Sequence, residues 1–304
     1  MARLLVHRDG AELAVFANEA DRLGAEELPP GIGVHRVPWH GSLADPTPWP
    51  AGAPVWRILS EDDAGTDLRA ARASLLPSEQ ERYRALCAET AAALTDVLSA
   101  ATPQTSERQL AAALGSRILD AGADPLVLLV SGDSGVAHRH PLPTDARLGL
   151  RAMAVACARR QGLIANVTRW VAFGRPQPGE ELSDTAILNV EADLFAALTP
   201  EAPLAPVLRV IQESYPRHGF AADEWTRHHQ GGAAGYAGRD PRLAPGIPDR
   251  IQTGQAFAWN PTAPGAKVED TVLLTASGVE VLSVDPRWPT VQVAGRARPA
   301  VLRR

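Results

Sequence analysis

The sequence predicts an α/β (α+β) fold built from two similar blocks, each with two helices followed by strands. Helical spacing of apolar residues occurs twice, over 77–121 and over 184–215, and strand-like apolar segments follow each time. The two blocks are offset by roughly a hundred residues, although their sequence identity is negligible. Two such αα-β halves would enclose a central curved antiparallel sheet with helices outside, and a site between the halves is expected.

The first block begins with a helix whose start is marked by Ser78. Glu81 stands three residues later, which is the spacing of a capping box. A second helix is expected from about 106 to 121, where leucines and an isoleucine form an apolar stripe. The segment PLVLLV at 125–130 then predicts a buried strand.

The second block repeats this order. Helices are expected near 184–198 and 204–215, and strand-like segments follow at 256–260 and 268–275. A Ser-Gly turn at 277–278 separates the last of these from the segment VEVLS.

The amino-terminal part has a different character. Residues 1–70 are rich in Pro, Gly and Trp, which predicts a short α/β segment with a helix around 11–23 and then an irregular, proline-stiffened stretch. This part is too short for a catalytic domain of its own. We therefore expect an accessory segment over 1–73 and the main domain over 74–304.

Composition narrows the class of partner. The 304 residues are 45% hydrophobic and 21% charged, with a net charge of −5, so neither nucleic acid nor an anionic membrane is an expected partner. No apolar stretch of about 18 residues and no signal-peptide pattern is present. Cys87 and Cys157 lie among apolar or alanine-rich neighbours, which predicts buried free thiols and a cytoplasmic protein. A small-molecule substrate is therefore the expected partner.

Two segments carry candidate functional residues in the first block. HRHPLPT at 138–144 holds His140 on a backbone that two prolines keep extended, and a histidine there can act as acid or base. The alternative is a surface histidine beside a turn. In LIANVTRW, Asn166 and Thr168 would share one face of a strand and Arg169 the other, with structural hydrogen bonding as the alternative role.

The richest segment is TRHHQGGAAGYAGRD at 226–240. Its glycines allow close backbone approaches. Tyr236 supplies a hydroxyl donor and Arg239 a planar guanidinium, and both can bind a carboxylate or carbonyl of a substrate. If His228 and His229 lie on a strand, their side chains point to opposite faces, so one of the two enters any site. A tight loop with solvated histidines is the alternative.

Two further polar residues border apolar segments in the second block. Asn260 ends the segment AFAWN, and Glu269 is the second residue of VEDTVLLT. A carboxylate beside a buried strand needs a partner. The alternative is an exposed glutamate or a structural salt bridge.

Together these segments resemble the M24, or pita-bread, family of methionine aminopeptidases, proline-specific aminopeptidases, prolidases and creatinase. The resemblance covers about residues 75–285. RHPLPTD with LGLRA is similar to a Pro-His stretch of the family, which puts His140 at its substrate-proximal histidine. Residues 14–60 also look like the tail of the amino-terminal domain of creatinase-like members, with most of that domain absent.

The resemblance also assigns the family's metal-ligand positions. Gly162 to Arg169 resembles the strand with the second metal-binding aspartate, which becomes Asn166, and the first, eleven residues earlier, becomes Val155. HHQGG resembles His-Gly-x-Gly, so His228 or His229 takes the metal-histidine place. FAWNP resembles the family's Glu-Pro segment, and Asn260 takes the position of that metal-binding glutamate. VEDTVLLTASGVEVLS is the closest match and puts Glu269 at the last ligand.

These departures predict that the dinuclear metal centre of the family is absent. The family uses two aspartates, one histidine and two glutamates, and three of the four carboxylates are replaced here. Valine offers no lone pair and asparagine only a neutral carbonyl, so two divalent ions would lack balancing charge. We therefore expect no metal and no other cofactor.

Three functions follow from this resemblance. The first is a metal-independent hydrolase or lyase for a small C–N substrate, either an amide, an amino-acid derivative or a guanidino-like compound. Creatinase is its precedent: His140 would be the acid/base, His228 or His229 a relay, and Glu269 an orienting group. Substrate contacts would come from four further residues: Tyr236, Arg239, Asn166 and Asn260.

The second function is a non-catalytic binding protein that has lost its metal site. The third is a metallopeptidase with a rebuilt mononuclear centre from His140, His229 and Glu269. Pita-bread enzymes with an amino-terminal extension are often dimeric, which is the sole indication of a homodimer.

Overall fold

The computed structural model describes residues 2–44, 59–61, 63–133, 135 and 138–304. The chain divides into two compact units, Met1–Ser60 and Glu61–Arg304. The division falls earlier than the expected boundary after residue 73. The segment that follows Ser60 belongs to the second unit, where Arg69 and Arg72 form ion pairs with Asp249 and Asp240. The proline-rich stretch expected to be irregular lies largely outside the described residues.

The first unit is a three-stranded sheet with one helix. Strand β1 (Ala2–His7) pairs antiparallel with β2 (Gly10–Phe16), and β2 pairs in parallel with β3 (Ile32–Val37). Helix α1 (Ala17–Glu26) connects β2 to β3. The expected helix at 11–23 is therefore wrong in its first half. Residues 10–16 are the central strand, because both of their edges are hydrogen-bonded to neighbouring strands.

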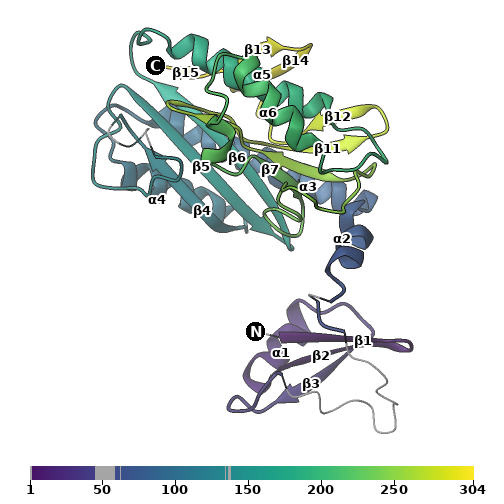
Figure 1. The fold of residues 1–304 in the computed structure, drawn as a ribbon. Helices are drawn as coiled ribbons and strands as arrows, with labels where there is room; N and C mark the ends of the chain where they lie inside the picture. The colour runs from purple at the N-terminus through teal and green to yellow at the C-terminus, as the bar shows by residue number, and fades with distance from the viewer. Residues whose placement is uncertain (1, 45–58, 62, 134, 136–137) are drawn as a thin grey trace. The chain divides into compact units, whose positions relative to one another are not determined.

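The second unit begins with the first αα-β half (Figure 1). The short helix α2 (Gly65–Ala73) precedes the long helix α3 (Pro77–Ala100), and α4 (Glu107–Asp120) follows. Three antiparallel strands come next, listed here with their bounds: β4 (Asp124–Ser131), β5 (Arg151–Arg160) and β6 (Leu163–Ala172). A two-residue strand, β15 (Leu302–Arg303), adds in parallel to the free edge of β6.

The second half repeats the pattern with shorter strands. Helices α5 (Glu180–Ala196) and α6 (Val207–Arg217) precede a four-stranded antiparallel sheet in the order β12-β11-β8-β7. Its strands, in chain order, are β7 (Gly231–Ala234), β8 (Ala256–Trp259), β11 (Asp270–Thr275) and β12 (Gly278–Val281). A small hairpin of β9 (Thr262–Ala263) and β10 (Ala266–Lys267) connects β8 to β11, and β13 (Thr290–Val293) pairs with β14 (Arg296–Pro299).

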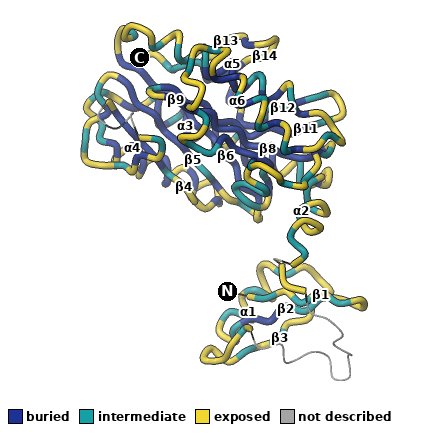
Figure 2. The backbone as a smooth tube through the Cα atoms, viewed as in Figure 1, coloured by how far each residue is buried: buried dark blue, intermediate teal, exposed yellow. Residues whose placement is uncertain are grey.

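The two sheets meet where β6 lies beside the start of β11. The backbone N–H of Thr168 donates to the carbonyl of Glu269 at 2.9 Å, and the N–H of Asn166 donates to Thr271 Oγ1 at 2.9 Å. These contacts place the residue pairs 166/168 and 269/271 of the two halves side by side. The central strands β5, β6 and β8 are buried along most of their length (Figure 2).

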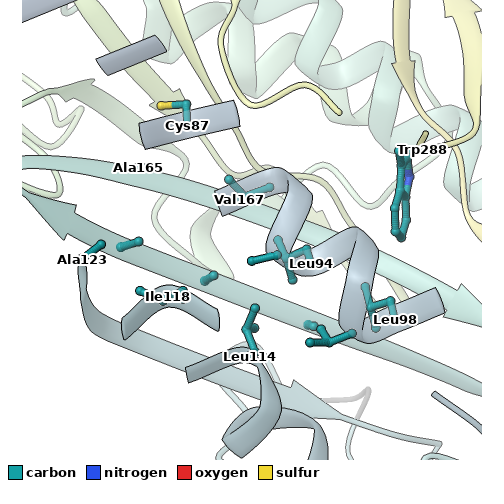
Figure 3. Packing of buried hydrophobic residues seen from close by; sticks show 14 of the residues in the cluster. Cys87, Leu94, Leu98, Leu114, Ile118, Ala123, Ala165, Val167 and Trp288 are labelled. Carbon is teal, nitrogen blue, oxygen red and sulfur yellow. The ribbon is translucent and has the colours of Figure 1, made fainter. Parts of the chain in front are cut away.

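The helices of each half cover one core. Figure 3 shows Leu94 and Leu98 of α3 and Leu114 and Ile118 of α4 packed toward Val167 of β6. Leu94, Leu114 and Ile118 belong to the apolar spacing that the sequence predicted for these helices. A second core lies under α5 and α6, where Phe257 and Trp259 of β8 are fully buried. Within the described residues, no helix has the length and apolar character needed to cross a membrane.

Two local expectations are corrected. Helix α3 begins at Pro77, and the backbone N–H of Leu76 donates to Glu79 Oε2 at 2.7 Å, so the capping box of Ser78 and Glu81 does not form. Proline favours the first helical position, which moves the cap to residue 76. Strand β4 is buried only in its second half, because it is an edge strand and Leu126 remains 42% exposed.

Candidate active site

A cavity of about 580 Å³ lies over the strands where the two halves meet. Val155 and Cys157 of β5 and Asn166 of β6 line it. Cys157 is paired with Asn166 in the strand register, and Val155 with Thr168, so these side chains share one face. The predicted alternation along β6 is confirmed, because Arg169 points to the other face and pairs with Asp270.

The cavity combines both halves of the unit. Its full lining is apolar on the β4 side and polar elsewhere, and consists of Val127, Leu129, His140, Val155, Cys157, Asn166, His229, Gly238, Arg239, Arg242, Asn260, Lys267 and Glu269. Of the eight predicted site residues, six belong to this lining. They are His140, Asn166, His229, Arg239, Asn260 and Glu269.

Glu269 is held at the floor of the cavity by two cations. Its Oε1 accepts from Arg239 at 2.8 Å, while its Oε2 accepts from Thr168 Oγ1 at 3.0 Å and lies 3.8 Å from Lys267 Nζ. The ion pairs and hydrogen bonds lower the pKa of Glu269 although burial opposes them. The carboxylate is therefore ionised, and both of its oxygens already have partners.

Lys267 also lines the cavity, and the sequence reasoning missed it. It is 5% exposed and lies at the end of β10, two residues before Glu269. Burial lowers its pKa, although the charge of Glu269 opposes this. One signal could have found it: 29 of the 30 basic residues counted as Lys or Arg are arginine, so Lys267 is the only lysine of the sequence.

His228 and His229 lie together instead of on opposite sides of a strand. Their rings stack with centroids 4.4 Å apart, and His228 Nε2 lies 2.8 Å from His140 Nε2. One of the two, His229, lines the cavity, as expected, but the strand alternation on which that expectation rested is wrong. The pair follows the short 3-10 helix η1 (Glu224–Arg227) and precedes β7, so the alternation of strand side chains does not apply.

The surroundings keep these histidines neutral. Burial lowers the pKa of His228 to about 2, and the charge of Lys267 and the neighbouring rings act in the same direction. Burial and then the charges of Arg239 and Arg242 lower the pKa of His229 to about 4. The pKa of His140 is lowered by burial and then by Lys267. At neutral pH the three imidazoles are therefore uncharged, and each can accept a proton.

The glycines of the segment 226–240 are required by close backbone contacts. Gly231 has φ +116°, and a Cβ there would lie 2.2 Å from the carbonyl oxygen of Ala258. Gly232 has φ +150°, and a Cβ there would lie 2.3 Å from the carbonyl oxygen of Pro241. Any side chain at either position would displace backbone, so the glycines fix the path that brings His229 to the cavity.

Tyr236 does not join the site. Its hydroxyl donates to Glu79 Oε1 at 2.5 Å, and the ring lies against Gly162, where a Cβ would approach it to 2.9 Å. Tyr236 connects the second half to the start of α3, and the role in substrate binding that the sequence suggested is corrected to a structural one. Cys157 and Arg242 line the cavity without having been predicted to do so.

The comparison with protein-family models gives a match to metallopeptidase family M24 over residues 81–276, which is more than half of the chain. The chain belongs to family M24. A search of curated protein sequences finds no match for this M24 protein.

Solved structures share the fold of this M24 protein at low identity. The Xaa-Pro dipeptidase from Bacillus anthracis is 15% identical with a TM-score of 0.75, and the match covers 100% of this chain and 89% of that one. The prolidase from Pyrococcus furiosus is 18% identical with a TM-score of 0.74, and coverage is 94% and 90%. The X-Pro aminopeptidase from Thermotoga maritima MSB8 is 14% identical with a TM-score of 0.72, and coverage is 99% and 90%. The predicted pita-bread fold is confirmed.

The residues of the cavity do not fit the two-metal centre that the family resemblance implies. Val155 has no lone pair, and Asn166 Oδ1 already accepts from Cys157 Sγ at 3.2 Å. Glu269, the remaining carboxylate at the ligand positions, is engaged by Arg239 and Lys267. Two divalent cations in this space would be repelled by Arg239 and Lys267. Glu269 alone would supply negative charge to balance them.

Proposed function

We propose that this M24 protein is a metal-independent hydrolase that cleaves a C–N bond in a small amide or amino-acid derivative. The observation that carries the proposal is the engagement of Glu269 by Arg239 and Lys267. It leaves the ligand positions without a free carboxylate, while neutral histidines remain at the same cavity. Histidine acid/base chemistry needs no metal.

The acid/base group of this proposal is His140, which lines the cavity. Its Nε2 lies 2.8 Å from that of His228, so a hydrogen bond between the two rings can fix the tautomer of His140. His140 removes a proton from water as the water oxygen bonds to the amide carbon. The same proton passes to the leaving nitrogen when the C–N bond breaks, and an acid and an amine result.

Asn260 is suited to orient the amide. It is 2% exposed and lines the cavity, and within the described chain its side chain makes no hydrogen bond. A buried amide without a partner favours a ligand that supplies one. Asn166 is less available to a substrate, because its side chain is hydrogen-bonded to Cys157 and to the carbonyl of Ile164.

The test is amine release from a set of dipeptides, N-acyl amino acids and simple amides in the presence of a chelator. His140→Ala should reduce turnover by about 100-fold or more, the usual contribution of general acid/base catalysis. His138→Ala is the matched control, because it lies in the same segment and does not line the cavity. Turnover that survives His140→Ala contradicts the assignment. Absence of turnover with every substrate would favour the non-catalytic binding protein.

A second candidate rests on the same histidines. Ring nitrogens of His140, His228 and His229 lie within 4.8 Å of one another, and three imidazoles can hold one zinc or similar ion. Glu269 does not join this group, so the rebuilt centre with Glu269 is replaced by a three-histidine one. Loss of turnover with chelator and recovery with Zn²⁺ would favour this candidate over the metal-independent one.

A further inference from the structure

We infer that the cavity binds the anionic group of its substrate, a carboxylate, in the space where the M24 metal ions would lie. This inference rests on the proposed function, because it names the substrate class of the same site. The side chains that would hold the anion are Lys267, Arg239, Arg242 and Asn260, all of which line the cavity.

The first argument is the charge of the cavity. Lys267, Arg239 and Arg242 bring three positive charges, and Glu269 brings one negative charge, so the lining is left with two positive charges. The neighbouring cation Arg139 is already paired with Glu224, and the histidines are neutral. An anion is the ligand that such a lining attracts, and a guanidinium cation like that of creatine would be repelled.

The second argument is that donors in the cavity have no acceptor. Lys267 Nζ makes no hydrogen bond to any described residue, and its nearest ion-pair oxygen is 3.8 Å away. Arg239 Nε is buried and also without a partner, while the other nitrogens of its guanidinium bond to Glu269 and Gly238. Buried donors of folded proteins are nearly always bonded. A ligand that supplies an acceptor can therefore bond to both donors.

The third argument is the choice of lysine. In a chain with 29 arginines, the one lysine stands in this cavity. An ammonium is a compact point charge on a flexible stem, whereas a guanidinium is a larger planar fork. Its charge is also close enough to lower the pKa of His140 and His228, second to burial. Lys267 and His140, the acid/base group of the proposed chemistry, line the same cavity.

The size and apolar wall of the cavity favour a carboxylate on a small organic body. Val127, Leu129 and Val155 form the apolar side. An amide substrate bound with its carboxylate at Lys267 and Arg239 would place its apolar part on this wall. A free inorganic anion would leave the wall uncovered, which is why we assign the carboxylate of a substrate and not phosphate alone.

The single lysine permits a direct test. Full-length protein is prepared with lysine labelled at 13Cε and 15Nζ, so one side-chain signal reports the cavity. Acetate, neutral acetamide and inorganic phosphate are titrated at constant ionic strength. We expect acetate to shift the signal saturably and acetamide to leave it unchanged. No shift with acetate or phosphate up to about 100 mM would overturn the inference, since even weak sites bind in the millimolar range.

Variants locate the anion. Arg242→Gln, at an exposed position of the cavity, should weaken acetate binding about tenfold, and Arg239→Gln should weaken it further. Arg175→Gln, an exposed change outside the lining, is the control and should change nothing. Equal acetate affinity in Arg242→Gln, Arg239→Gln and wild type would contradict the assignment. A shift with phosphate alone would contradict the carboxylate.

The result is separable from the proposed function. Acetate binding without hydrolysis of any amide would leave the anion site standing and remove the hydrolase. Hydrolysis of neutral amides, with no shift of the lysine signal on addition of acetate, would support the hydrolase and remove the anion site.

Discussion

Two consecutive carboxylates, Glu269 and Asp270, face opposite sides of the chain and lie in different charge clusters. Asp270 is fully buried and bonds to Arg169 at 2.8 Å and to Arg298 at 2.6 Å. Arg298 also bonds to Glu191 at 2.9 Å, so two arginines meet two acids. This balanced cluster connects β6, β11, β14 and α5.

The cluster around Glu269 is different. It has three cations, Lys267, Arg239 and Arg242, for one carboxylate, and it lines a cavity of about 580 Å³. The balanced cluster pairs two arginines with two acids inside the fold, and its one buried oxygen without a hydrogen bond among the described residues is Glu191 Oε1, whereas the cavity cluster has positive charge and donors left over. The comparison teaches that buried charge alone does not indicate a site, and that unbalanced charge at a cavity does.

The largest expected effect is on stability, and it falls on the balanced cluster. Asp270→Asn removes the charge that two buried guanidiniums share, and should cost about 3–5 kcal/mol in free energy of unfolding. Glu269→Gln should cost less, about 1–2 kcal/mol, because water in the cavity can solvate Lys267 and Arg239. Urea unfolding of both variants measures the difference. Equal losses of unfolding free energy in the two variants would contradict the difference between the two charge clusters.

A pH effect of intermediate size is expected from the cavity histidines. Their folded pKa values, about 2 for His228 and about 4 for His229, lie below the ordinary 6.5. The unfolded chain therefore binds more protons than the folded one below pH 6.5, and stability falls as pH drops from there toward 4. His228→Gln should flatten this fall. Unfolding free energies from pH 7.5 to 5 test it, and an unchanged slope in the variant contradicts the burial of a neutral His228.

The smallest expected effect is that of Lys267→Met on stability. The change removes a buried cation that, among the described residues, makes no hydrogen bond and one ion pair at 3.8 Å, and it keeps an unbranched side chain of similar length. Stability should change by no more than about 1 kcal/mol in either direction. A larger loss, measured by urea unfolding, would mean that Lys267 belongs to the structural framework in the same way as Arg298.

Much of the site was predictable from strand periodicity. The alternation that sets Asn166 and Thr168 against Arg169 holds, because the period of a strand is local. Val155 was placed by the family resemblance, and it lies across the hairpin at the same cavity. The positions of helices α3 to α6 were likewise predictable within a few residues, whereas α1 begins six residues later than expected.

Other features depend on tertiary contacts that no local pattern contains. His228 and His229 stack because the chain leaves a 3-10 helix just before them. Tyr236 turns away to reach Glu79, which is distant in sequence. Lys267 enters the cavity through a two-strand hairpin whose geometry the apolar pattern did not predict. Its rarity in the sequence was the available signal.

The most direct test of this account is the metal content of the purified protein after dialysis against Mn²⁺, Co²⁺ and Zn²⁺, measured by inductively coupled plasma mass spectrometry. Lys267 and Arg239 engage the carboxylate that a metal would need, so we predict less than about a tenth of an ion per chain. Retention of two ions would contradict the loss of the dinuclear centre. Retention of one ion that His228→Ala releases would assign the three histidines to a metal and contradict their role as free bases.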